Sequence, residues 1–131
     1  MAAVRNRDSK AELLLRRELH SCGLRYRLHA RDVFGRPDIV IRSRRVALFV
    51  DGDFWHGNAW RLRNLPDLAS MFPTRTEWWV EKITRNMRRD EEVSRRLEAE
   101  GWEVIRVWES EVLEDPAASA ARVLQRIERK M

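Results

Sequence analysis

The sequence is poor in the residues and segments that cross-link or anchor a small protein. Cys22 is the only cysteine among 131 residues, which excludes an internal disulfide and a zinc site built on cysteines. No apolar run approaches the roughly 20 residues that a membrane-spanning helix needs, and the N-terminus lacks the apolar stretch of a signal peptide. Internal repeats, low-complexity tracts and linkers are also missing. We therefore expect one domain over residues 1–131, in a cytoplasmic protein that does not contact a membrane.

Charge is what the sequence has in excess. Charged residues make up 36% of the chain, and 26 basic against 21 acidic side chains leave a formal net charge of +5. Such a balance favours an anionic partner such as nucleic acid, although a need for solubility alone would produce it too. Hydrophobic residues reach 44%, which is normal for a globular protein, and six tryptophans are unusual.

The apolar periodicity predicts seven elements in the order α-β-β-β-α-β-α. They are a helix within 7–23, a strand over 24–29, a hairpin of 37–41 with 46–50, a helix within 74–101, a strand over 102–108 and a helix after Pro116. Residues 52–75 form a long irregular segment, and long loops in small domains usually serve a site. Because a helix links strand 46–50 to strand 102–108, these two strands should be parallel. The expected fold is α/β, a small mixed β-sheet flanked by helices.

The longest helix presents two stripes. Thr76 is the expected N-cap, and the core stripe is Val80, Ile83, Met87 and Leu97. Beside it, Trp79, Lys82 and Asn86 follow one another at i, i+3 and i+7. An aromatic ring, a cation and an amide on one stripe suit stacking on DNA bases and hydrogen bonding to them. A packing tryptophan next to a solvated polar face explains the same pattern.

The sequence "FVDGDFWHG" at 49–57 closes an apolar strand with polar and aromatic side chains. A three-residue turn at 43–45 would pair residue 38 with residue 50 and place Asp38 opposite Val50, with Asp51 next to them. Carboxylate and carbonyl oxygens are the ligands that Mg²⁺ prefers. A two-residue turn would shift this register by one, and Asp38 after Pro37 is also a common turn residue.

His56 and Glu12 are the other candidates for chemistry. His56 follows Asp51 by five residues, and its near-neutral pKa suits proton transfer beside a metal site. A purely structural histidine is the alternative. Glu12 lies in the first turn of the first helix, where a favourable position in the helix dipole is the better explanation on local evidence alone. His20 and His29 receive no role.

Four segments, taken in order, resemble the bacterial very-short-patch-repair (Vsr) mismatch endonucleases. They are "GRPDIVI", "ALFVDGDFWHG", "FPTRTEWWVEKITRNMRRD" and "GWEVIRVWES", and the match covers about residues 3–112. The resemblance implies a restriction-endonuclease-like fold related to the PD-(D/E)XK nucleases, and a Mg²⁺-dependent nick in one strand of double-stranded DNA. In the family the nick lies beside the thymine of a G·T mismatch left by deamination of 5-methylcytosine. A functional link to a cytosine DNA methyltransferase, a nucleoid-associated location and a monomeric state are further expectations.

The family motifs assign roles residue by residue. Asp38 would be the metal-binding carboxylate, Val50 would lend its carbonyl to the metal, and His56 would assist proton transfer. Glu12 falls on a functional glutamate of the first helix. Phe54, Trp55 and Trp79 match rings that wedge into the base stack, Lys82 and Asn86 match positions near the mismatched pair, Met1 matches a minor-groove methionine, and Arg7 with Arg5 would contact phosphates.

The sequence departs from the family at the metal sites. Asp51 stands where the best-known members have a histidine, so it cannot be a positively charged partner of the phosphate, and it would ligate metal or orient a water. Asn58 and Ser110 stand where many members have zinc-binding cysteines, and Asp90 matches a zinc-ligand position without thiolate partners. We therefore expect no structural zinc, with apolar packing holding the loop instead; its members are Trp60, Leu62, Leu65, Leu68 and Phe72.

Two alternatives to a mismatch nickase stay open at this point. A nuclease of the same fold could cut other distorted or modified DNA. A DNA-binding module with a degenerate site would also account for the departures at Asp51 and at the cysteine positions.

Overall fold

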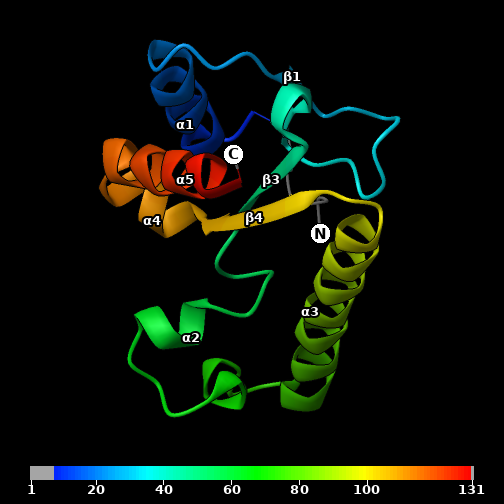
Figure 1. Ribbon diagram of the computed structural model, residues 1–131. Coiled ribbons are helices and arrows are strands. Elements are labelled where there is room, and N and C mark those ends of the chain that lie inside the picture. Colours follow the sequence, from blue (N-terminus) through cyan, green and yellow to red (C-terminus); the bar gives the residue numbers. More distant parts are fainter. Residues whose placement is uncertain (1–7, 131) are drawn as a thin grey trace.

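The computed structural model describes residues 8–130, and it has the expected α/β architecture (Figure 1). The strands of one sheet, in spatial order, are β1 (Arg27–Leu28), β2 (Ile39–Ile41), β3 (Val46–Asp51) and β4 (Glu103–Trp108). The helices are α1 (Lys10–Ser21), α2 (Ala59–Leu62), α3 (Thr76–Ala99), α4 (Glu109–Glu114) and α5 (Pro116–Lys130), with 3-10 turns η1 (Arg42–Arg44) and η2 (Leu68–Met71). No helix among the described residues is long and apolar enough to cross a membrane.

The sheet is mixed because β2 runs antiparallel to β3, whereas β4 runs parallel to it. The predicted parallel pair, joined through the long helix α3, is therefore confirmed. The predicted hairpin register was wrong by one residue. Ile41 pairs with Val46 across a four-residue turn, in which Arg45 adopts φ 54° and its N–H donates to the Arg42 carbonyl at 3.1 Å. One additional turn residue shifts every cross-strand pair by one.

Three further predictions about elements need correction. The strand expected over 24–29 is reduced to the two exposed residues of β1. Within 52–75, the chain forms the short α2 and η2, and Asp67 caps η2 by accepting the Ser70 N–H at 3.0 Å. Arg75 in a left-handed conformation, and not Thr76, is the N-cap of α3, and the Thr76 hydroxyl instead donates to the Phe72 carbonyl.

The two faces of the sheet carry separate hydrophobic clusters. One face packs on α1, α4 and α5 through Leu15, Leu48, Ile105, Val123 and others. The other face meets α3 through residues that include Phe49, Leu97 and Trp102. In Figure 1 the ribbon of β4 accordingly lies between α3 on one side and α1, α4 and α5 on the other.

The first half of α3 extends past the end of the sheet (Figure 1), where it contacts η2, which in turn contacts α2. This position corrects the predicted core stripe. Ile83 and Leu97 are fully buried, but Val80 is only half-buried and Met87 is 36% exposed. The part of α3 beyond the sheet faces the segment that follows β3, and this arrangement encloses the pocket described next.

Candidate active site

A pocket of ≈ 750 Å³ opens where β3 ends, between the start of α1 and the side of α3. The predicted site residues that line it are Glu12, Asp38, Val50, Asp51, Phe54, Trp55, His56, Lys82 and Asn86. Trp79 does not line it. Met1, Arg5 and Arg7 lie outside the described residues. The pocket therefore brings together carboxylates, an imidazole, aromatic rings, a lysine and an amide from residues that are up to 74 positions apart in the sequence, Glu12 and Asn86.

Asp38 lies against the main chain of β3, as predicted, although the strand register differs. Its Oδ2 accepts the N–H of Val50 at 2.7 Å, because the side chain spans the offset that the longer turn introduces. Burial raises the pKa of Asp38 to about 7, and the charges of Glu12 and Asp51 add to this effect, while the Val50 hydrogen bond and His56 oppose it. The Asp38 side chain is 15% exposed and contacts no lysine or arginine among the described residues. Such a carboxylate suits a divalent cation, because these ions take hard oxygen ligands.

Glu12 is held from several sides at the start of α1. Ser9 caps the helix by accepting the Glu12 N–H at 3.1 Å, and the Glu12 side chain is 2% exposed. Its carboxylate pairs with Arg16 and lies 2.9 Å from Nε2 of His29. Placement in the helix dipole alone therefore does not account for Glu12, because the carboxylate is buried, paired and directed at the pocket.

His29 is a residue that sequence reasoning missed. Its Nδ1 lies 4.0 Å from Asp38 Oδ1, so the imidazole stands between the carboxylates of Asp38 and Glu12. The Leu28–Ile39 pairing of β1 with β2 places residue 29 next to residue 38, and the His29 N–H donates to the Asp38 carbonyl at 3.2 Å. His29 is close to Asp38 in the sequence, and this was the available signal. It becomes informative only when β1 is known to pair with β2.

His56 is paired with Asp90 of α3. Nδ1 donates to Asp90 Oδ2 at 2.5 Å, and Asp51 Oδ1 lies 3.9 Å from the same nitrogen. Burial alone would lower the pKa of His56, but the Asp90 hydrogen bond and the two carboxylate charges outweigh it and raise the pKa. Asp90, which matches a zinc-ligand position of the family, contacts this imidazole, and Asp51, His56 and Asp90 lie close enough together to hold a metal ion.

Arg106 is the second residue that the sequence left unassigned. It rises from β4 over the ring of its β3 neighbour Phe49, with 4.1 Å from the guanidinium carbon to the ring centre. One guanidinium nitrogen donates to both carboxylate oxygens of Asp51, at 3.1 and 3.2 Å. A charged residue between the apolar Ile105 and Val107 of β4 was the available signal.

The aromatic side chains form one cluster beside the pocket, made of Phe54, Trp55, Phe72, Trp78 and Trp79. Trp79 stacks on Phe72 with 5.1 Å between ring centres and 6° between planes, whereas Trp78 is 46% exposed. Trp79 therefore packs within this cluster, and its predicted contact with DNA bases stays a prediction. Asn86 donates its side-chain N–H to the Trp55 carbonyl at 3.0 Å, so this amide supports the loop.

Asn58 and Ser110, which stand at the positions of zinc-binding cysteines in the family, are both hydrogen-bonded to Asp53. Asp53 accepts the side-chain N–H of Asn58 at 2.9 Å, and the hydroxyl and N–H of Ser110 at 2.7 and 2.9 Å. These contacts connect the segment after β3 to the start of α4. Asp53 therefore accepts hydrogen bonds from both positions, and the absence of a structural zinc stays a prediction.

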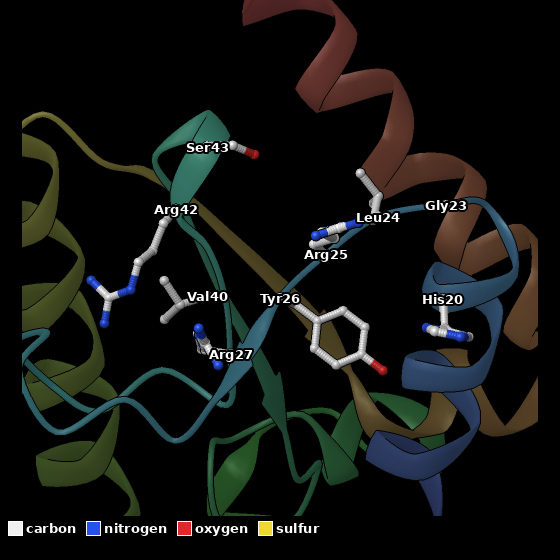
Figure 2. A pocket seen from close by; sticks show the side chains of 9 residues that line it. All are labelled: His20, Gly23, Leu24, Arg25, Tyr26, Arg27, Val40, Arg42 and Ser43. Carbon is white, nitrogen blue, oxygen red and sulfur yellow. The ribbon is translucent and has the colours of Figure 1, made fainter.

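A second pocket, of ≈ 660 Å³, lies along β1 and the end of α1 (Figure 2). Figure 2 shows Arg25, Arg27 and Arg42 with Tyr26 and His20 around it. None of the described residues that line this pocket carries a carboxylate. It therefore lacks the ligands for a divalent cation, and the pocket at the end of β3 is the candidate active site.

Comparison with known proteins identifies the family of this chain. The sequence model of the family described as DNA mismatch endonuclease Vsr matches residues 1–62. The type II nicking enzyme V.NmeDIP of Neisseria meningitidis is 40% identical over 130 residues, which cover 99% of this chain and 84% of that enzyme. The type II nicking enzyme V.XorIIP of Xanthomonas oryzae is 44% identical over 123 residues (94% and 85%), and the DNA mismatch endonuclease Vsr of Escherichia coli is 38% identical over 109 residues (83% and 66%). The chain therefore belongs to the Vsr family of DNA endonucleases.

Proposed function

We propose that this endonuclease nicks one strand of double-stranded DNA at G·T mismatches in a Mg²⁺-dependent reaction. Relatives of the chain are named as a mismatch endonuclease and as nicking enzymes. The observation that carries the proposal is that the half-buried Asp38 carboxylate and the His56–Asp90 pair line one open pocket. This combination offers a cation site and a proton carrier to a phosphodiester.

Asp38 and the main-chain carbonyl of Val50 would hold the cation. When bound there, a divalent ion such as Mg²⁺ supplies charge stabilisation to a phosphoryl oxygen. Glu12, buried at the pocket and paired with His29, orients groups around Asp38. The raised pKa of Asp38 supports this assignment, because a carboxylate that burial destabilises gains most from a cation.

His56 moves the proton. A carboxylate accepts hydrogen bonds, so the bond to Asp90 keeps Nδ1 protonated and leaves Nε2 able to take a proton from the attacking water. Asp90 also fixes the ring orientation, as an orienting carboxylate does in other proton-transfer pairs. Asp51 lies beside the same imidazole and keeps its own carboxylate on Arg106.

DNA would enter across the aromatic cluster. Phe54 and Trp55 line the pocket and present ring faces and edges that can separate bases beside a mismatch. Lys82 lines the same pocket from α3 and would approach the mismatched pair together with Asn86. Because such G·T pairs arise by deamination of 5-methylcytosine, a cytosine DNA methyltransferase is the functional partner that this proposal implies.

A nicking assay on end-labelled duplexes tests the proposal. Duplexes with G·T, other mismatches or perfect pairs are compared in varied sequence contexts, with Mg²⁺ or with a chelator. We expect a single-strand cut at the G·T pair that requires Mg²⁺. Equal cutting of perfect duplexes would favour the alternative of a nuclease for other distorted or modified DNA. Binding without any product, unchanged by Asp38→Ala, would favour a degenerate binding module.

The Asp53 network leads to a prediction about zinc. Because Asn58 and Ser110 both bond Asp53, the fold should not depend on a metal at these positions. Dialysis against a strong chelator should leave the melting temperature of the protein unchanged, whereas Asp53→Ala should lower it. A large loss of stability on chelation, with recovery on adding Zn²⁺, would refute the zinc-free assignment.

The ring of Trp55 should set the preference for mismatched DNA. Trp55→Ala should weaken binding to a G·T duplex by about 1–3 kcal/mol, the usual value of one lost base stack, while the salt dependence from phosphate contacts persists. Fluorescence anisotropy on G·T and perfect duplexes measures both quantities. Trp60→Ala is the matched control, because Trp60 is in the same segment but bonds the Gly57 carbonyl outside the pocket lining. An equal loss of affinity for both duplexes would contradict the role of Trp55.

A further inference from the structure

We infer that Arg106 is a positioning residue of the nicking reaction, which fixes Asp51 and Asp90 and, through them, the imidazole of His56. This inference rests on the proposed function, since it concerns the same pocket. Arg106 itself has no role in the family motifs or in the proposed metal site.

The guanidinium of Arg106 connects three elements of the fold. Its donors reach the Asp51 carboxylate on β3 at 3.1 and 3.2 Å, the Ser94 hydroxyl on α3 at 2.9 Å and the Asp90 carbonyl on α3 at 3.0 Å. The plane lies over Phe49, and the side chain is 22% exposed. An arginine with this many fixed donors has a defined position, because its rigid fork matches several acceptors at once.

The groups that Arg106 holds are the groups that face His56. Asp90 accepts from Nδ1 of His56 at 2.5 Å, and Asp51 lies 3.9 Å from the same nitrogen. Arg106 also lies 3.9 Å from the Asp90 carboxylate, so it neutralises part of the charge of both acids. Two carboxylates at a pocket wall repel one another unless a cation stands between them.

Removal of Arg106 would therefore release both orienting groups. Among the described residues, Asp51 would then keep no cationic neighbour besides His56, and its carboxylate would turn toward the imidazole or toward solvent. Asp90 would lose the bond at its carbonyl, which anchors this turn of α3 to β4. The consequence is a misplaced imidazole in an otherwise intact fold, since the hydrophobic clusters do not depend on this ion pair.

A double-mutant cycle of Asp51 and Arg106 tests the inference. Arg106→Met should lower the single-turnover nicking rate at saturating DNA by about 100-fold, with DNA affinity in a chelator unchanged within about 2-fold. Asp51→Asn should cost about 10-fold. If the two losses were independent, the rate of the double variant would fall by the product of the two factors. We expect a smaller loss, because the double variant lacks the unpaired carboxylate that Arg106→Met alone leaves at Asp51. Rates that multiply independently would overturn the inference.

Arg126 and Glu103 provide a matched control. Arg126 on α5 donates to the Glu103 carboxylate at 2.8 Å and to the Val104 carbonyl at 3.1 Å, so it pairs with an acid and a main-chain oxygen of the same strand β4. It does not line the pocket. Arg126→Met should reduce thermal stability in the way that Arg106→Met does but leave the nicking rate unchanged. An equal loss of rate in both variants would reduce Arg106 to a structural residue and overturn the inference.

A readout without DNA separates this inference from the proposed function. Nitrogen NMR of the imidazoles reports which ring nitrogen of His56 carries the proton and whether it is hydrogen-bonded, with His20 as internal reference. Arg106→Met should weaken the Nδ1 hydrogen bond of His56 and leave the His20 signals in place. An unchanged His56 signal would overturn the inference. Failure of the unmodified protein to nick any duplex would refute the proposed function, and the His56 signal would then decide the positioning role alone.

Discussion

Replacing Asp38 by asparagine should lower the nicking rate by about 1,000-fold or more and should, at the same time, stabilise the metal-free protein above neutral pH. Loss of rate follows from loss of the carboxylate that would bind the cation, whose charge stabilisation is worth several kcal/mol. Asparagine keeps an acceptor for the Val50 N–H at 2.7 Å, so the local main-chain contact persists. Function and stability should therefore change in opposite directions.

The pH dependence of this gain follows from the raised pKa. In the folded protein the pKa of Asp38 is about 7, above the value of 3.8 for an unperturbed aspartate. The contribution of this group to the free energy of unfolding is therefore fully present below pH 3.8 and is lost as the pH rises through 7. Three pKa units correspond to about 4 kcal/mol, an order of magnitude only, and asparagine escapes this loss.

Chemical denaturation in a chelator, from pH 4 to pH 8.5, measures the effect. The advantage of Asp38→Asn over the unmodified protein should grow across this range, and Mg²⁺ should stabilise only the unmodified protein at pH 8. Asp32→Asn is the control, because the exposed Asp32 pairs with Arg42, which lowers its pKa, and this substitution should bring no gain at high pH. A pH-independent difference for Asp38→Asn would contradict the assignment of a buried, cation-seeking carboxylate.

Replacing His56 by alanine should lower the nicking rate by about 100- to 10,000-fold, the usual contribution of a positioned proton carrier. DNA affinity should persist, because the rings and basic side chains that would contact DNA are untouched. In the unmodified protein the rate should rise as the pH rises through the pKa of His56, since the neutral imidazole accepts the proton. That pKa should lie above 6.5, because Asp90 and Asp51 raise it.

Asp90→Asn and His20→Ala complete this test. Asp90→Asn removes a hydrogen bond and a charge that raise the pKa of His56, so the pH–rate profile should shift to lower pH with a reduced maximum. His20 is exposed at the end of α1, and its replacement should change neither rate nor profile. A His56→Ala variant that nicks at an undiminished rate, or a profile that does not move in Asp90→Asn, would remove His56 from the proposed mechanism.

Much of the fold follows from apolar periodicity, whereas the details of the turns do not. The parallel pair of β3 and β4 was predictable, because a long helix separates two short apolar runs. The hairpin register was not predictable, because nothing in "RSRR" indicates that Arg45 takes a left-handed conformation. The predicted contact between Asp38 and Val50 survives this error, since a side chain can span an offset of one residue that a backbone ladder cannot.

Some residues of the site can likewise be recognised in the sequence, and others cannot. Asp38 and His56 are recognisable because they stand within short motifs next to strands. Asp90, Arg106 and His29 contribute through partners on other elements, and Arg106 meets Asp51 across 55 positions of sequence. Such residues become visible only when strand pairing and helix packing bring the partners together.

Asn86 and Asp90 are one turn apart on α3, and each holds a successive residue of the same loop, Trp55 by its carbonyl and His56 by its ring. If DNA binding displaces the main chain at Trp55, the displacement would therefore reach the helical turn that also holds the imidazole. The proposed insertion of Trp55 between bases and the proposed proton transfer by His56 would then share one support. A duplex that resists opening would leave this support undisturbed, so the proposed mechanism would spare intact DNA without a contact to every base pair.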